Sequence, residues 1–227
     1  MERFKNVVIS WLQKRPNVLA RLERGVWRAR FEAWKAEHPC PVFEWRMPLY
    51  EYVSESEKLD GGMDYLEFGV FEGATLKWWV KRNQHPDSRF YGFDTFVGLP
   101  QAWDWAPAGH FSTQGKTPLI DDKRCLFEVG LFQNTLPAFL DRVRLDRRKV
   151  IHLDADLYGS TIFVLLHLAP RLQKDDILIF DEFMTSTHEF RAWCDFLETC
   201  PLEYQVLAKV PDAAQVAIRI LGPAVGG

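Results

Sequence analysis

The chain has 227 residues, of which 47% are hydrophobic and 26% are charged. This is the composition of a globular protein, and it excludes a wholly disordered chain, a collagen or a coiled coil. The net charge of −3 is too small to favour nucleic acid as a partner.

No segment of the sequence predicts a membrane span or a signal peptide. The longest apolar run, residues 162–170, is interrupted by His167 and is shorter than the roughly 20 residues that a spanning helix needs. The first residues lead into no apolar block of the signal-peptide type. The four cysteines have neither a C-x-x-C pair nor a zinc-binding spacing, so they are predicted to be reduced thiols. We therefore expect a cytoplasmic protein.

The first 35 residues are basic, with nine Lys or Arg against three Asp or Glu. Their apolar residues recur at helical spacing, and Pro16 is expected to end or kink the first helix. The apolar stripe of that helix consists of Phe4, Val7, Val8, Trp11 and Leu12. A basic helix with tryptophan on its apolar side suits contact with a membrane surface, or packing on the domain or a second subunit. Packing is the favoured interpretation, and residues 1–60 are predicted to be a helical extension that serves as a lid, dimer contact or substrate region.

From residue 61 to residue 227 the pattern predicts a single α/β domain. Strands are predicted at 64–70, 89–94, 124–129, 150–154 and 176–183, and helices at 74–82, 136–143, 160–172 and 188–199. The last two strands, 204–210 and 215–221, flank Pro211 and Asp212 and are predicted to form an antiparallel hairpin. Alternating strands and helices indicate a parallel sheet with helices on both faces, whose ligands bind at the carboxyl ends of the strands. The long segment 97–118 is predicted to be a functional loop.

The turn after the first strand carries Gly69 and Gly73, which allow the backbone to turn tightly and approach a ligand. Their spacing differs from the G-x-G-x-x-G fingerprint that cradles a pyrophosphate. The acids Glu67 and Glu72 would repel a pyrophosphate and suit a cationic ligand that carries an amino group and a sulfonium. Asp94, at the end of the second strand, can accept hydrogen bonds from both ribose hydroxyls. These features predict an adenosine-type ligand, with residues 130–132 beside its adenine.

Four carboxylates follow the fourth and fifth strands: Asp154, Asp156, Asp181 and Glu182. The ends of neighbouring strands lie about 5 Å apart, so these groups are expected to share one rim. Such a cluster is costly unless a cation binds or some carboxyls are protonated. Helix capping explains one or two of them, but not four. Hard oxygen ligands favour magnesium or manganese, which could lower the pKa of a substrate hydroxyl while a carboxylate takes its proton.

The motifs together resemble the macrocin O-methyltransferase family, whose members use S-adenosylmethionine and include sugar O-methyltransferases of antibiotic pathways. The resemblance runs in family order over residues 64–190, in the segments 66–73, 93–100, 130–137, 153–161 and 179–183. It implies a Rossmann-like class I methyltransferase fold, a seven-stranded and mostly parallel sheet whose last strand is antiparallel. It also implies a homodimer. Where the antibiotic sugar enzymes have Asp-Asp after the fifth strand, this chain has Asp181-Glu182.

The resemblance implies roles for individual residues. Magnesium would be held by Asp154, Asp181 and Glu182, with Asp156 as the general base beside Asp154. The predicted cofactor-binding residues are Glu67, Gly69, Phe71, Glu72, Gly73, Thr75, Asp94, Thr95, Gly130, Leu131, Phe132 and Asp154. The predicted walls of the acceptor site are Tyr158, Trp103, Trp105 and Phe111, with His110 and His188 as further candidates. His152, inside a strand, is predicted to be a core or supporting residue.

The sequence thus predicts an O-methyltransferase that acts on a hydroxyl of a sugar or another polyhydroxylated natural product. Two alternatives remain open at this point. One is a non-catalytic S-adenosylmethionine-binding partner in a larger assembly, against which the four gathered acids argue. The other is a nicotinamide-dependent oxidoreductase, against which the glycine spacing, the acidic loop and the terminal hairpin argue.

Overall fold

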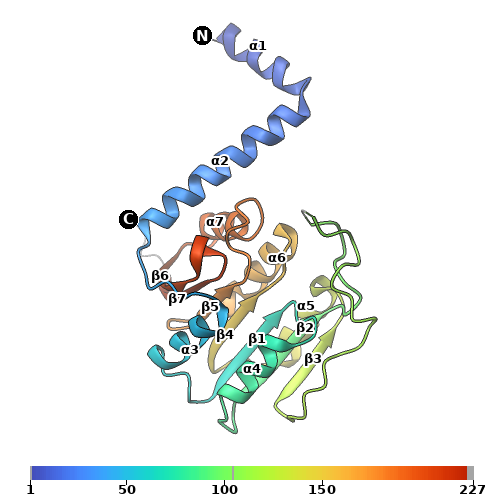
Figure 1. The fold of residues 1–227 in the computed structure, drawn as a ribbon, viewed down its shortest axis with the longest axis vertical. Coiled ribbons are helices and arrows are strands. Elements are labelled where there is room, and N and C mark those ends of the chain that lie inside the picture. The colour runs from blue at the N-terminus through green and yellow to red at the C-terminus, as the bar shows by residue number, and fades with distance from the viewer. Residues whose placement is uncertain (1, 104, 224–227) are drawn as a thin grey trace. The chain divides into compact units, whose positions relative to one another are not determined.

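The computed structural model describes residues 2–103 and 105–223, with the side chains of 2–4, 7 and 8 outside the description. The chain forms two compact units, residues 1–39 and 40–227. The first unit consists of α1 (Glu2–Gln13) and α2 (Pro16–Glu37) (Figure 1). Pro16 lies in the first turn of α2, where its missing N–H costs nothing, so it separates the helices as predicted.

Part of the apolar stripe predicted for the first helix, namely Phe4, Val7 and Val8, lies outside the described side chains. Of the rest, Trp11 is exposed and Leu12 is half-buried. Among the described helices, none has the length and apolar character needed to span a bilayer.

The second unit is built on a seven-stranded sheet in the order β3-β2-β1-β4-β5-β7-β6. The strands are β1 (Met63–Phe68), β2 (Arg89–Asp94), β3 (Cys125–Val129), β4 (Arg148–Leu153), β5 (Ile177–Phe180), β6 (Leu202–Lys209) and β7 (Val216–Pro223). The first five strands are mutually parallel, and β7 is antiparallel to both β5 and β6. The predicted parallel sheet and terminal hairpin are therefore confirmed.

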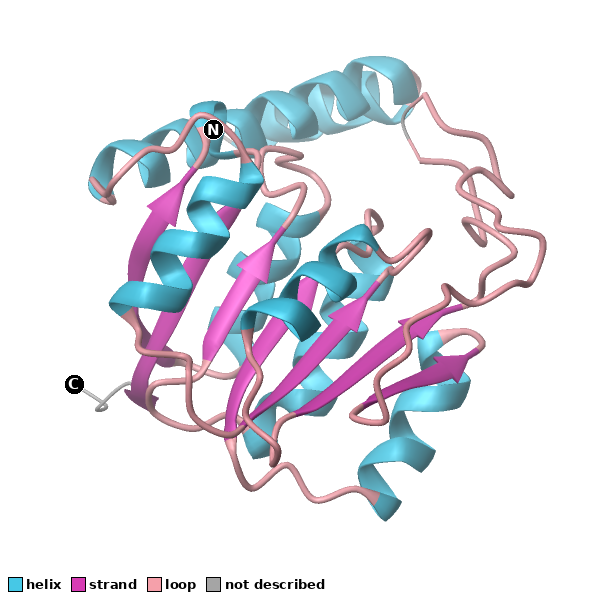
Figure 2. Cartoon of the chain, turned by 60° about the horizontal axis from the view of Figure 1, so that its bottom comes forward, coloured by secondary structure: helices cyan, strands magenta, loops and turns pink. Residues whose placement is uncertain are grey.

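Helices cover both faces of this sheet (Figure 2). On one face, α3 (Arg46–Ser56) and α4 (Ala74–Arg82) join a core that includes Tyr65, Val150 and Ile179. The other face carries α5 (Phe132–Arg142), α6 (Tyr158–Leu168) and α7 (Glu189–Thr199). Aromatic contacts bind these helices to the strands: Phe139 of α5 packs on Phe93, and Trp193 of α7 packs on Phe180. Successive strand residues alternate between the two cores, as a pleated sheet requires.

Helix α3 is the element that sequence reasoning missed. It is short, has Pro48 in its first turn, and gives no strong helical period. Its side chains Leu49, Tyr50 and Val53 are nonetheless fully buried against the sheet. Just before it, the backbone at Val42 bridges to Lys209 of β6. Helix α3 accordingly belongs to the compact unit that spans residues 40–227.

At the amino ends of β4 and β5, a fully buried ion pair joins two strands that carry the candidate site at their other ends. The Nζ atom of Lys149 lies 3.1 Å from Oδ2 of Asp176, and both side chains are inaccessible to solvent. Asp176 also accepts the backbone N–H groups of Lys149 and Gln173 at 2.8 and 2.7 Å. Loss of either partner would leave an uncompensated buried charge, so the pair is expected to contribute strongly to the stability of the contact between β4 and β5.

The substitution Asp176→Ala is expected to lower the free energy of unfolding by about 3–5 kcal/mol, because it leaves the Lys149 ammonium buried without its partner. Urea unfolding followed by circular dichroism measures this change. The control Asp146→Ala, at an exposed position, should change the free energy of unfolding by less than about 0.5 kcal/mol. Equal effects of the two substitutions would contradict the role assigned to the pair.

Candidate active site

The site lies at the carboxyl ends of the parallel strands, where the residue after each strand continues the hydrogen-bond ladder. The N–H of Gly69 donates to Phe93 O, and that of Gly130 donates to Asp94 O. The N–H of Asp154 donates to Phe68 O, and that of Asp181 donates to Leu153 O. These four bonds are each 2.9 Å long. The backbone at the site is therefore tied to the sheet by the same kind of hydrogen bond that joins its strands.

Gly69 is required by its surroundings. Its φ is +94°, and a Cβ atom there would lie 1.8 Å from the carbonyl oxygen of Asp154. No other residue fits between the ends of β1 and β4 without moving one of them. The absence of a side chain thus lets the first turn close over the fourth strand.

Asp94 organises the same turn through its carboxylate. Oδ2 accepts the N–H groups of Val70 and Phe71, both at 2.8 Å, and Oδ1 accepts that of Phe96 at 2.8 Å. A carboxylate offers about four acceptor positions, so one remains for a ligand hydroxyl. Asp94 therefore both shapes the turn and keeps an acceptor free on the ligand side.

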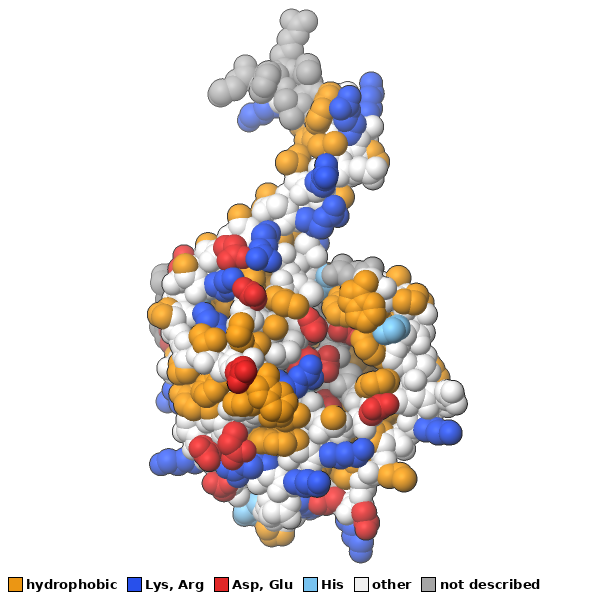
Figure 3. All heavy atoms as spheres, viewed as in Figure 1, with side chains coloured by type: hydrophobic (Ala, Val, Ile, Leu, Met, Phe, Trp, Pro, Cys, Tyr) orange, Lys and Arg blue, Asp and Glu red, His pale blue; other side chains and the backbone are white. Residues whose placement is uncertain are grey.

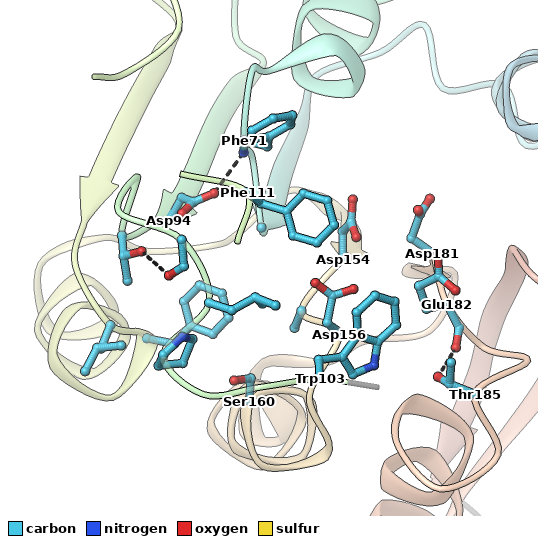
Figure 4. A pocket seen from close by; sticks show the side chains of 18 of the residues that line it. Phe71, Asp94, Trp103, Phe111, Asp154, Asp156, Ser160, Asp181, Glu182 and Thr185 are labelled. Carbon is cyan, nitrogen blue, oxygen red and sulfur yellow. Dashed lines mark hydrogen bonds between the residues drawn. The ribbon is translucent and has the colours of Figure 1, made fainter. Parts of the chain in front are cut away.

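A cavity of about 600 Å³ opens above these strand ends, within the range of about 300–1,000 Å³ that is typical of small-molecule sites. The predicted site residues in its wall are Gly69, Phe71, Asp94, Thr95, Trp103, Trp105, Phe111, Leu131, Phe132, Asp154, Asp156, Asp181 and Glu182. In Figure 4, Asp154 and Asp156 lie between Asp94 on one side and the Asp181–Glu182 pair on the other. Figure 3 shows this face from outside, with acidic side chains in a hollow flanked by hydrophobic ones.

The predicted functional loop, residues 97–118, forms a folded cover. The N–H of Leu99 donates to His110 O at 2.9 Å, and the N–H of Gly109 donates to Leu99 O at 2.8 Å. Trp103 is buried in a small cluster with Leu157, whereas Trp105 remains 70% exposed. Trp103, Trp105 and Phe111 thus line the cavity from a loop that is closed by its own hydrogen bonds.

Several predicted cofactor residues lie outside the described cavity wall. Glu67 points to the α3 side of the sheet, where its Oε2 accepts the hydroxyl of Tyr65 at 2.5 Å. Gly73 caps α4 with φ +73°. Thr75 is buried in the first turn of that helix, and Glu72 lines a separate, shallower hollow. Gly130 supports the end of β3 through its backbone.

Three predicted substrate residues are also held elsewhere. The hydroxyl of Tyr158 donates to Asp195 at 2.9 Å, and the guanidinium of Arg191 lies over its ring. Nδ1 of His188 accepts the backbone N–H of Tyr158 at 3.3 Å. His110 packs edge-on against Phe111, with ring centroids 4.4 Å apart. None of the three is among the residues that line the cavity.

A buried polar network runs beneath the cavity, centred on His152. Its Nδ1 lies 3.1 Å from the Tyr65 hydroxyl and 3.7 Å from Oε2 of Glu67. Its Nε2 lies 3.3 Å from the Tyr50 hydroxyl and 3.5 Å from Oδ1 of Asp181. Burial disfavours the imidazolium, but the two carboxylates outweigh it and raise the pKa of His152 to about 10. The network therefore places a positive charge under the acidic rim.

Asp181 is the most heavily partnered acid of the rim. Besides His152, its Oδ1 accepts the Tyr50 hydroxyl at 3.2 Å, and its Oδ2 lies 3.3 Å from Nη1 of Arg46. Burial opposes ionisation, but His152, Arg46 and Tyr50 hold the pKa of Asp181 below its ordinary value. Gln215 also donates to its carbonyl oxygen at 2.8 Å. Asp181 is thus the fixed anion of the rim.

The neighbouring acids are shifted in the opposite direction. Burial, together with the charge of Asp181, raises the pKa of Asp154 well above its ordinary value. Burial, followed by the charges of Glu182, Asp181 and Asp94, raises the pKa of Asp156 to about 7. Burial and Asp181 raise that of Glu182 to about 7 as well. The cluster therefore holds protons near neutral pH, which is one of the two solutions that the sequence analysis anticipated.

Asp156 has a strained backbone. Its φ is +58°, in the left-handed region that residues with a side chain rarely adopt. Such strain persists where the surrounding structure over-determines it, and it concentrates at functional positions. Here it turns the chain between β4 and α6 so that the carboxylate reaches the cavity.

Sequence reasoning missed two charged residues of this site. Arg46 enters from α3, and no motif lies near it in the sequence. Glu189 is fully buried at the start of α7, where its Oε2 accepts the N–H of Glu182 at 3.0 Å. Burial raises its pKa well above the ordinary value. The His188–Glu189 helix start was visible in the sequence, but the inward direction of Glu189 was not.

The predicted magnesium ligands do not assemble into a metal site. Asp154, Asp181 and Glu182 all line the cavity. Across the described part of the chain, however, no three His, Cys, Asp or Glu side chains come together as a group that could hold a metal ion. Arg46 and Tyr50 occupy the two oxygens of Asp181 instead.

Comparison with known proteins agrees with the motifs. The model of the macrocin-O-methyltransferase (TylF) family matches residues 110–213. Mycinamicin III 3''-O-methyltransferase of Micromonospora griseorubida is 28% identical over 120 residues, which cover 49% of this chain and 44% of that protein. A second relative is 26% identical over 177 residues. It is the 8-demethyl-8-(2,3-dimethoxy-alpha-L-rhamnosyl)-tetracenomycin-C 4'-O-methyltransferase of Streptomyces olivaceus. That match covers 64% of this chain and 65% of the relative. The chain thus spans between about half and two thirds of these relatives' lengths.

Solved structures share the fold. The calicheamicin methyltransferase CalS11 superposes with a TM-score of 0.60 at 23% identity, over 87% of this chain and 92% of that one. The O-methyltransferase NovP superposes with a TM-score of 0.57 at 18% identity, over 75% and 77% of the two chains. The predicted class I methyltransferase fold is confirmed by these likenesses and by the strand order. In sequence, the chain resembles the macrocin O-methyltransferase family, as its motifs predicted.

Proposed function

We propose that this chain is an S-adenosylmethionine-dependent O-methyltransferase that acts on a hydroxyl group of a sugar or another polyhydroxylated natural product. One observation carries the proposal: a single cavity joins the Gly69 turn, the free acceptor of Asp94 and the strained Asp156. The sulfonium donor and the hydroxyl acceptor would meet there. The family resemblance supports the same reading.

The residues of the cavity fit the methyl donor. Asp94 keeps one acceptor position for a ribose hydroxyl beside the Gly69 turn, and Leu131 and Phe132 offer an apolar surface for the adenine. The acidic rim suits a cationic sulfonium. When bound, S-adenosylmethionine supplies the methyl group: the acceptor oxygen forms the new O–C bond while the C–S bond breaks and its electron pair stays on sulfur.

Asp156 is the best-placed general base. It lines the cavity, and its pKa of about 7 makes the carboxylate both available and basic at neutral pH. Burial and the charge of Asp181 raise the pKa of Asp154 beside it well above its ordinary value. In this mechanism the proton of the acceptor hydroxyl passes to Asp156 as the new O–C bond forms.

The acceptor class is inferred from the aromatic residues of the cavity. Trp103 and Phe111 lie beside Asp154 and Asp156 (Figure 4), and Trp105 lines the same cavity. Aromatic surface next to carboxylates suits the apolar face and the hydroxyl edge of a sugar ring. The names of the two relatives describe methylation at a 3'' position and at a 4' position, the latter on a rhamnosyl compound. A glycosylated natural product or an activated sugar is therefore the class to test first.

The remaining expectations stay predictions. Magnesium held by Asp154, Asp181 and Glu182 is implied by the resemblance, but it is not part of this proposal, because no such group of ligands comes together among the described residues. The homodimer, the cytoplasmic location and the role of residues 1–60 are proposed. An exposed stripe of Leu19, Leu22 and Val26 on α2 supports packing against a second copy, because three neighbouring apolar side chains there are about half exposed.

The substitution Asp156→Asn is expected to lower kcat for methyl transfer by about 10²- to 10⁴-fold, because the amide cannot accept the hydroxyl proton. Transfer of a labelled methyl group to a panel of nucleotide sugars and glycosides measures the loss. Affinity for S-adenosylhomocysteine should stay within about twofold, since Asp156 acts on the acceptor rather than on the adenosyl group. The control Asp146→Asn, at an exposed site, should retain full activity. Full activity of Asp156→Asn would contradict the assignment of Asp156 as the general base.

The pH dependence of kcat/KM is expected to follow the protonation of Asp156. Because burial and neighbouring acids raise the pKa of Asp156 to about 7, the base is protonated below that pH. The rate should fall about tenfold for each pH unit on the acid side and level off above it. In the variant Glu182→Gln the acid limb should move to lower pH, because one of the charges that raise the pKa of Asp156 is removed. An acid limb at the same pH in both proteins would argue against this assignment.

A further inference from the structure

Arg46 brings a positive charge to the acidic cavity from a part of the chain outside the family motifs. It is the first residue of α3, which is held in place by the fully buried Leu49, Tyr50 and Val53. Among the described residues that line the cavity, it alone is basic. The packing of α3 in the core therefore fixes the backbone position from which the Arg46 side chain extends.

Across the residues that the structure describes, the Arg46 guanidinium makes one ion-pair contact within the protein, with Asp181. Nη1 lies 3.3 Å from Oδ2 of Asp181, while 39% of the Arg46 side chain remains exposed. A guanidinium carries five N–H donors in a fixed plane, so the contact with Asp181 leaves donors for a further acceptor. An oxygen that develops negative charge beside Arg46 would accept hydrogen bonds from them.

The same contact conflicts with a divalent ion at this rim. Tyr50 donates to Oδ1 of Asp181, which also lies near His152, and Arg46 lies on Oδ2. A metal ion bound to Asp181 would have to displace Arg46 or sit beside its positive charge. Arg46 therefore already balances the charge of Asp181 from within the protein.

We infer that Arg46 supplies the positive charge that stabilises the acceptor oxygen during methyl transfer, in the place that a divalent metal ion would otherwise take. The inference rests on the proposed function. The atoms balance as in that reaction: the methyl group moves from sulfur to the acceptor oxygen, and the hydroxyl proton goes to Asp156. Arg46 neither gains nor loses a proton, and it donates hydrogen bonds to the oxygen throughout.

The test compares Arg46→Met with Arg82→Met, since both remove a guanidinium that contacts carboxylates and keep an apolar stem. Arg82 pairs with Glu51 and Asp60 on the surface, so it serves as the matched control. Wild type and Arg82→Met should keep their rate of methyl transfer within about twofold when a chelator replaces Mg²⁺. Arg46→Met should lose about 10²- to 10³-fold in kcat in chelator, the cost of removing one donor to a developing oxyanion.

The second readout does not depend on the acceptor. Binding of Mn²⁺ to the protein saturated with S-adenosylhomocysteine is followed by the loss of the free-ion electron paramagnetic resonance signal. Wild type and Arg82→Met should show no site at micromolar Mn²⁺, whereas Arg46→Met, which frees Asp181, should bind at least about tenfold more tightly. Unchanged affinity for S-adenosylhomocysteine shows that each variant is folded.

Several results would overturn the inference. They are a wild-type enzyme inactivated by chelator, micromolar Mn²⁺ binding by wild type, or full activity of Arg46→Met in chelator. Failure of the proposed function is a different outcome: the folded wild-type chain would then not bind S-adenosylhomocysteine at all, while the Mn²⁺ comparison repeated without it would still report on Arg46.

Discussion

The repulsion among buried carboxylates at the ends of β4 and β5 is the constraint on which the rest of the site depends. Asp154, Asp156, Asp181 and Glu182 share one rim, and Glu189 is buried behind Glu182. Five ionised carboxylates in so little solvent would be prohibitively unfavourable. The chain resolves this by fixing one anion, Asp181, between Arg46 and His152, and by shifting the pKa values of the others upward. This arrangement gives the acids different roles, with Asp181 as a fixed anion and Asp156 as the proposed base.

The sheet provides the rigidity that this arrangement needs. Parallel strands bring the two acidic segments to the same edge, and the ladder bonds of Asp154 and Asp181 hold them there. At the opposite ends of the same strands, the buried Lys149–Asp176 pair joins β4 to the start of β5. Beneath the rim, the two tyrosines Tyr50 and Tyr65 connect His152 to acids on β1 and β5.

Much of the fold was predictable because its signals are local. The predicted bounds of the helix at 74–82 and the strand at 89–94 agree with α4 and β2, since each has a clear period and a clear end. The strand-end motifs located the cavity, because parallel strands must bring their carboxyl ends together. Gly69 could be singled out from its sequence context, although the contact that requires it, with the Asp154 carbonyl, is visible only in three dimensions.

The features of the site that could not be predicted depend on the direction of side chains and on contacts between residues far apart in the sequence. Glu67 looks like a ligand-binding acid in the sequence, yet the alternation of a strand turns it toward Tyr65 and His152. Tyr158 closely follows Asp154 and Asp156 in the sequence, but its hydroxyl donates a hydrogen bond to Asp195 of α7. No local sequence pattern marks Arg46 as a site residue, because its place in the site follows from its contact with Asp181, a residue 135 positions later in the chain. Such pairings are set by tertiary packing, which no local pattern encodes.

A calorimetric titration with S-adenosylhomocysteine, run on the wild-type chain and on Asp94→Ala, tests the central claim that the cavity at these strand ends binds the adenosyl donor. The account predicts one-to-one binding by wild type, equally tight in magnesium and in chelator, and an affinity at least about tenfold weaker for Asp94→Ala, which loses both the free acceptor and the turn that Asp94 organises. No binding by a folded wild-type sample would contradict it, and so would equal affinity of the two proteins. In either case the Gly69 turn would be an ordinary connection between a strand and a helix.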